Sequence, residues 1–176
     1  MSKSTAEHRA KAPSRINFAL ITVSTSRYSD FQSGRRVENP SGDMAVKLLV
    51  GAGYKVVYSD LVSDDADLIR KSLEKAVNMR SVNVVIMCGG TGVTKTDVTI
   101  ETVAPLIEKD LPGFGEIFRK LSYESVGSAA IITRAAAGLI RGKVVFCLPG
   151  SPQAVEMALR SLIIPEAAHI VKHARE

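Results

Sequence analysis

The stretch that decides the fold is NVVIMCGGTG, residues 83–92. Its first six residues, 83–88, form a mostly apolar run whose length and branched side chains are typical of a strand covered on both faces. The run leads directly into Gly89-Gly90-Thr91-Gly92. Ligands of parallel α/β sheets bind beyond the carboxyl ends of strands, where glycines let backbone N–H groups approach an anion. The stretch therefore predicts a buried strand followed by a loop that either binds phosphate or is only a tight turn.

Upstream of this stretch, apolar runs alternate with amphipathic segments. The runs 16–23 and 54–61 are typical of strands, and residues 24–39 between the first strand and the first helix are polar and predict a long loop. The first helix is expected to begin at Pro40 with Ser41 as its N-cap, and the second to be capped by Asp64 or Asp65. This alternation predicts right-handed crossovers and a parallel sheet with helices on both faces.

Downstream, the pattern adds helices and a hairpin. A helix is expected over 98–107, a turn with an exposed phenylalanine over 111–115, and short helices over 117–121 and 126–132. The apolar runs 135–140 and 143–148 are joined by Arg141-Gly142, which predicts a hairpin and hence one antiparallel strand. Further helices are expected to begin at Ser151 or Pro152 and at Pro165. The fold class is therefore α/β, with three layers and a mostly parallel sheet containing one antiparallel strand.

Composition limits the classes of function. The chain has 176 residues and a net charge of +5, with 5% aromatic residues and no Trp. Few aromatic rings argue against a nucleic-acid stacking platform, whereas a mild basic excess suits small anionic ligands. No apolar run is long enough to span a membrane, and the two cysteines end apolar runs, as buried cysteines do. We expect a basic, disordered or loosely attached arm over residues 1–14, a single domain over 15–176, and a cytoplasmic location.

Two aspartates are candidates for metal binding at the predicted edge of the sheet. Asp97 follows the glycine loop and Asp64 follows the second strand. A carboxylate beside bound phosphates requires a cation between them, and Mg²⁺ takes one or two carboxylates together with phosphate oxygens. Helix capping is the alternative for each aspartate. The residues alone leave both interpretations open.

Other polar residues follow predicted strands. Pro149-Gly150-Ser151-Pro152 repeats the order of strand, glycine and helix start, so it either binds a second anionic group or is a turn capped by Ser151. Ser24, Thr25 and Ser26 follow the first strand as ligand donors or turn residues. Lys95 and Arg134 are further candidates for phosphate contacts. His8, His169 and His173 have no nearby nucleophile in this pattern, so no hydrolytic triad is expected.

Three motifs follow one another along the chain: GGTG with Asp97, LPGFGE at residues 111–116, and LPGSP at residues 148–152. In this order they resemble the MogA/MoaB family of molybdenum-cofactor biosynthesis. Residues 121–127 (LSYESVG) and 133–135 (TRA) look closer to MoaB than to MogA. The resemblance covers residues 16–164 and implies the same three-layer α/β fold.

The resemblance also implies an activity, the adenylylation of molybdopterin by ATP with Mg²⁺, with release of pyrophosphate. It assigns catalysis and the metal to Asp64 and Asp97. The expected binding residues are Ser24, Ser26, Gly89, Gly90, Thr91, Gly92, Lys95, Pro149, Gly150 and Ser151. It further implies homotrimers or homohexamers, with the product serving molybdenum or tungsten insertion. The alternative is a carrier or scaffold that binds molybdopterin without catalysis.

Overall fold

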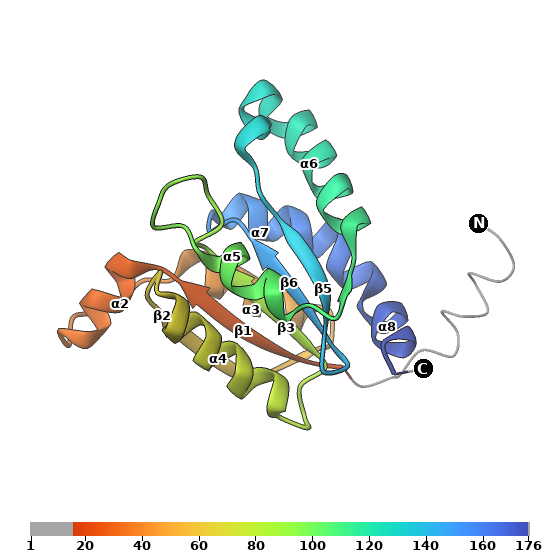
Figure 1. Cartoon of the computed structure of the whole chain (residues 1–176), viewed down its shortest axis with the longest axis horizontal. Helices are drawn as coiled ribbons and strands as arrows, with labels where there is room; N and C mark the ends of the chain where they lie inside the picture. The colour runs from red at the N-terminus through yellow and green to blue at the C-terminus, as the bar shows by residue number, and fades with distance from the viewer. Residues whose placement is uncertain (1–15, 176) are drawn as a thin grey trace, which may run out of the picture.

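The computed structural model describes residues 16–175, so the predicted arm over residues 1–14 lies outside the described residues (Figure 1). The strands are β1 (Asn17–Val23), β2 (Lys55–Val62), β3 (Val84–Cys88), β4 (Lys109–Asp110), β5 (Ala136–Ile140) and β6 (Lys143–Leu148). The α-helices are α2 (Thr25–Gln32), α3 (Pro40–Gly51), α4 (Ala66–Asn78), α5 (Thr99–Val103), α6 (Pro112–Val126), α7 (Pro152–Ala158) and α8 (Ile164–His173). Short 3₁₀ segments, η1 (Ala104–Leu106) and η2 (Gly127–Ile132), follow α5 and α6, and a π segment, η3 (Leu159–Ile163), joins α7 to α8.

The strands form one six-stranded sheet in the order β2-β1-β3-β6-β5-β4. β1, β2, β3 and β6 are parallel, and β5 runs antiparallel to both of its neighbours. The predicted fold class, with a mostly parallel sheet and one antiparallel strand, is therefore confirmed. The two-residue β4 was missed because it is too short to show an alternating pattern.

Two cores cover the two faces of the sheet. One packs β-strand side chains such as Phe18, Ile86 and Phe146 against α3, α6, α7 and α8. The other packs the alternate strand positions, such as Ile21 and Met87, against α4 and the α5 region. Figure 1 shows these layers, with α4 and α5 in front of the sheet and α7 and α8 behind it.

The two cysteines occupy opposite cores, Cys88 in the first and Cys147 in the second, and both are free and buried. Burial raises the pKa of each thiol to about 12, which keeps both protonated at neutral pH. They therefore act as small apolar side chains, as expected from their positions. Within residues 16–175, no helix is both long enough and apolar enough to cross a membrane.

Several local predictions were wrong. The expected loop over residues 24–39 contains α2, an exposed helix with no buried residue, which hydrophobic periodicity could not reveal. Residues 112–126 form one helix rather than a turn and a short helix, because Pro112 stands in its first turn, where its missing N–H costs nothing. Phe114 is partly buried rather than exposed, and its ring packs edge-on against Phe146 at 4.9 Å between centroids.

The cap of α3, the hairpin and the last helix can each be compared with their predictions. Asn39, not Ser41, caps α3, because the Asn39 side chain accepts a hydrogen bond from the Gly42 N–H. The predicted hairpin is confirmed, and both Arg141 and Gly142 adopt positive φ, as the tight two-residue turn requires. The last helix, α8, begins at Ile164, one residue before the predicted start at Pro165, and the π segment connects it to α7.

Candidate functional site

The carboxyl ends of four neighbouring parallel strands meet at one edge of the sheet. In register, Val23 of β1 lies beside Val62 of β2, and Cys88 of β3 lies beside Leu148 of β6. The residues that follow these strands therefore emerge together, and backbone hydrogen bonds extend the ladder from Ser24 N to Val62 O (2.8 Å) and from Gly89 N to Leu148 O (3.0 Å). Segments distant in sequence thus share one site.

The glycine loop is held tightly where it leaves β3. Gly89 and Gly90 both adopt positive φ, which side chains other than glycine rarely tolerate. A Cβ atom at Gly90 would lie 2.5 Å from Asp64 Oδ1 and closer still to the Thr99 hydroxyl. Thr99 fixes the start of the loop by donating from Oγ1 to Gly89 O (2.8 Å) and from N to Gly90 O (2.9 Å). Glycine is therefore required here by conformation and by the close approach of a carboxylate.

Asp64 and Asp65 have separate roles. The Asp65 side chain caps α4 by accepting hydrogen bonds from the N–H groups of Asp67 and Leu68. Asp64 instead turns toward the start of α2, where its Oδ2 accepts hydrogen bonds from Thr25 N (3.0 Å) and Thr25 Oγ1 (2.9 Å). The alternative left open by the sequence is thereby resolved, since Asp65 is the cap and Asp64 faces the glycine loop.

Asp97 is not a helix cap either, because Val98 occupies the N-cap position of α5. Asp97 Oδ2 closes a turn within the glycine loop by accepting hydrogen bonds from Thr94 N (2.9 Å) and Thr94 Oγ1 (2.5 Å). The Thr94 hydroxyl lowers the pKa of Asp97 more than partial burial raises it, so this carboxylate is ionised at neutral pH. Its carboxylate oxygen also packs against Gly92, where a Cβ would lie 2.7 Å from Oδ2.

These groups line one open cavity of about 390 Å³. Its walls are the glycine loop, both aspartates, the chain after β1 and β6, and the segment after η2; they comprise Val23, Ser24, Asp64, residues 89–92, Asp97, Ile132, Thr133, Arg134, Pro149 and Gly150. A second, more apolar cavity of about 390 Å³ shares Thr133 and Pro149 with the first. Phe118, Met157 and Ser151 are among its walls. A polar cavity therefore adjoins a more apolar one.

Most of the predicted site residues lie at these two cavities. Ser151 lines the second one and caps α7 by accepting a hydrogen bond from the Ala154 N–H, so the predicted cap is confirmed and ligand binding by this serine stays a prediction. Ser26 and Lys95 line neither: Ser26 lies in α2 within 3.4 Å of Ser24 Oγ, and Lys95 is exposed on the outer half of the glycine loop.

Several residues that line or support the site could not be identified as site residues from the sequence. Thr25 was a general hydroxyl candidate without a partner, although its position directly after β1, next to β2, was a signal that it could reach Asp64. The Ser41 hydroxyl connects α3 to the turn at residues 149–152 by donating a hydrogen bond to Gly150 O (2.5 Å). Thr133 lies beyond η2 and lines both cavities; it was noted only as part of the TRA resemblance at residues 133–135 and not as a site residue.

The donor set fits Mg²⁺ better than a transition metal. Among residues 16–175, no three His, Cys, Asp or Glu side chains gather into a metal site. Two carboxylates beside a loop rich in N–H groups match the way in which Mg²⁺ is held jointly by one or two carboxylates and by phosphate oxygens. Asp64 and Asp97 are the residues that could hold it.

The fold and the site define a class of protein, an α/β domain with a glycine loop and two aspartates that line one cavity at the carboxyl edge of its sheet. Residues 19–169 match the family model described as a probable molybdopterin binding domain. The chain belongs to this family.

Similar proteins agree with that assignment. The chain is 42% identical to molybdenum cofactor biosynthesis protein B of Bacillus subtilis, over 97% of this chain and 96% of the relative. It is 44% identical to the molybdopterin adenylyltransferase of Pyrococcus furiosus, over 97% and 98% of the two chains. A crystal structure of the tungsten cofactor synthesizing protein MoaB from the same organism superposes with a TM-score of 0.83 at 43% identity, covering 94% of this chain and all of the other.

Proposed function

We propose that this protein adenylylates molybdopterin in the biosynthesis of the molybdenum or tungsten cofactor. The observation that carries the proposal is the convergence of Asp64 and Asp97, from separate crossovers, on the glycine loop at the mouth of one cavity. One relative at 44% identity is named molybdopterin adenylyltransferase and another at 40% is named probable molybdopterin adenylyltransferase, which supports the same activity here.

In this reaction a terminal phosphate oxygen of molybdopterin attacks the α-phosphorus of ATP. A new P–O bond forms, the bond between the α-phosphorus and the bridging oxygen breaks, and pyrophosphate leaves. Backbone N–H groups of residues 90–92 would hold phosphate oxygens, since the Gly89 N–H already donates to Leu148 O, and Asp64 and Asp97 would hold Mg²⁺. Bound Mg²⁺ would neutralise charge on the phosphates, and the protein otherwise contributes positioning and fixed hydrogen-bond donors.

The two cavities suggest how the substrates divide the site. The polar cavity, with the glycine loop and both aspartates, suits the reacting phosphates. The adjoining cavity, with Ala154 and Met157 as apolar walls for a ring and Ser151 for a polar edge, suits the pterin. Pro149 and Thr133 stand at the junction, where the two substrates would meet.

A pyrophosphate-release assay tests the proposal. Purified protein with ATP, Mg²⁺ and molybdopterin should release pyrophosphate only when all three are present. Removing one carboxylate, by Asp64→Ala or Asp97→Ala, should lower kcat roughly 10²- to 10³-fold, the size of effect typical of lost electrostatic stabilisation. Molybdopterin binding with no pyrophosphate release under any condition would instead identify a carrier, and full activity in Asp97→Ala would contradict the metal assignment.

We also propose that the protein acts as a homotrimer or homohexamer. The end of α6 and η2 carry four large apolar side chains, Tyr123, Val126, Ile131 and Ile132, that are between 58% and 90% exposed. Such a cluster is characteristic of an interaction surface. Light scattering should give three or six times the 18.9 kDa chain mass, and Ile131→Asp should lower it; a monomeric wild type would contradict the proposal.

A further inference from the structure

The outer half of the glycine loop, residues 92–96, is attached to the rest of the described structure less firmly than the inner half. The inner half is fixed by Thr99 and by backbone bonds to β6. The side-chain hydrogen bonds of the outer half that involve Thr94, Thr96 and Asp97 stay within the loop itself. In Figure 1 this part of the chain stands away from the body between β3 and α5.

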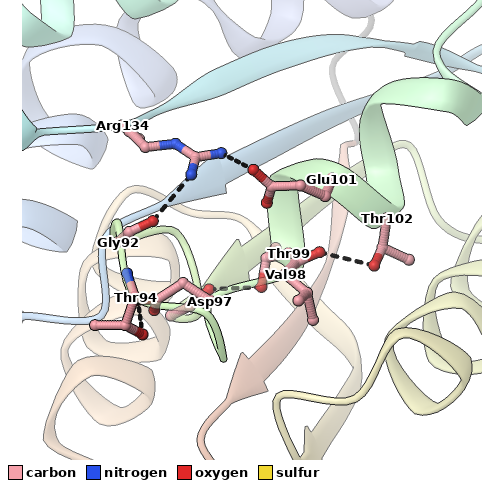
Figure 2. Close-up of polar contacts among 9 residues, drawn as sticks. Gly92, Thr94, Asp97, Val98, Thr99, Glu101, Thr102 and Arg134 are labelled. Atoms are coloured by element: carbon pink, nitrogen blue, oxygen red, sulfur yellow. Dashed lines mark hydrogen bonds and ion pairs between the residues drawn. The ribbon is translucent and has the colours of Figure 1, made fainter.

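One side chain from a distant segment reaches this outer half. Arg134, which follows η2, donates from Nη1 to Gly92 O at 3.0 Å. Its Nη2 forms a hydrogen-bonded ion pair with Glu101 Oε1 of α5. Figure 2 shows the guanidinium lying between Gly92 and Glu101, with both contacts made at once. Because the planar guanidinium is held at two points, its orientation toward Gly92 is fixed.

We propose that Arg134, braced by Glu101, is a positioning residue that holds the outer half of the glycine loop, and with it Asp97, in place for phosphate binding. The inference rests on the proposed function only for its consequence in catalysis. The two contacts of Arg134, to Gly92 and to Glu101, form what we call the brace, and they are present in the free protein. Arg134 ties three separate segments together, since its side chain, from the chain after η2, contacts both Gly92 and Glu101.

Hydrogen exchange in the free protein tests the brace directly. The hydrogen-bonded amides of Thr94 and Asp97 should exchange roughly ten- to a hundredfold faster in Arg134→Gln, the range expected for loss of charge-assisted hydrogen bonds. Glu101→Gln should speed the same amides less, and the double variant no more than Arg134→Gln alone, because both changes break one unit. Lys120→Gln is the matched control, because it removes one positive charge from an exposed i,i+4 pair on α6.

Kinetics provide the second readout. A brace predicts that Arg134→Gln raises the KM for ATP about tenfold while kcat at saturation changes less than about threefold, since a loosened loop binds substrate and transition state equally poorly. Arg134→Lys should recover part of the loss, because an ammonium can satisfy one of the two acceptors. Glu101→Gln should act in the same direction as Arg134→Gln.

The outcomes separate this inference from the proposed function. Faster exchange in both variants with an inactive wild type would support the brace and contradict adenylylation. Unchanged exchange in Arg134→Gln with an active wild type would overturn the brace and leave adenylylation standing. A Glu101→Gln enzyme that binds ATP more tightly than wild type would also overturn the positioning role of Arg134. That result would mean that Arg134, released from the Glu101 carboxylate, binds the phosphates directly.

Discussion

Substituting Gly90 by alanine should disrupt the site and destabilise the fold. Gly90 has a φ of +62°, and an alanine in this left-handed region costs roughly 1–2 kcal/mol. The new Cβ would lie 2.5 Å from Asp64 Oδ1 and would also overlap the buried hydroxyl of Thr99, and such overpacking adds about 1–3 kcal/mol. Gly90→Ala should therefore lose ~2–5 kcal/mol of unfolding free energy, or ~4–20 °C in Tm for a chain of this size.

Urea unfolding and Mg-ATP titration measure the two consequences separately. The matched control is Gly51→Ala, at the end of α3, where a Cβ would meet nothing within 4 Å and φ is not positive. This control should keep wild-type binding and gain about 0.4–1 kcal/mol. Gly90→Ala should bind Mg-ATP more weakly because Asp64 is pushed aside. A Gly90→Ala protein with wild-type stability and wild-type binding would refute the geometry described for the loop.

Three further substitutions test separate parts of the structure. Phe118→Ala removes a fully buried ring from the first core and should cost about 3–5 kcal/mol in chemical denaturation, so a loss below 1 kcal/mol would contradict the packing. Asp65→Ala removes the α4 cap and should cost about 1 kcal/mol without changing pyrophosphate release, whereas an activity loss like that of Asp64→Ala would disprove the division of roles. Because the folded-state pKa of Asp97 is lowered, chiefly by Thr94, its stabilising effect is present at neutral pH and is lost as pH falls below ~4. The stability difference between wild type and Thr94→Val should therefore shrink in acid. A difference that grew in acid would contradict the lowered pKa of Asp97.

The fold was predictable wherever one residue pattern dictated it. The buried strands at 17–23 and 84–88 and the hairpin turn at Arg141-Gly142 were recognisable, because apolar runs and turn residues report local structure directly. The exposed helix α2 and the two-residue β4 were not, because neither shows a periodicity set by burial. Pro112 was assigned to a turn, although it stands in the first turn of α6, where a helix accepts proline.

The site was predictable in its backbone but not in its side-chain partners. Gly89–Gly92 and Pro149-Gly150 follow parallel strands, so the topology places them at one edge. The choice between Asp64 and Asp65 required tertiary contacts, because both stand where a cap could form. Arg134 could be named from the sequence only as a general cation, since the packing of α6 and η2 decides that it reaches Gly92.

The most direct test of the central claim is identification of the product in a single turnover. Protein in excess over molybdopterin, mixed with ATP and Mg²⁺, is quenched and the pterin is analysed by mass spectrometry. We predict that the pterin gains one adenylyl group, with one pyrophosphate released per pterin. The Asp64→Ala and Asp97→Ala variants should convert almost no molybdopterin in the same time. Bound molybdopterin of unchanged mass with wild-type protein, beside intact ATP, would contradict it.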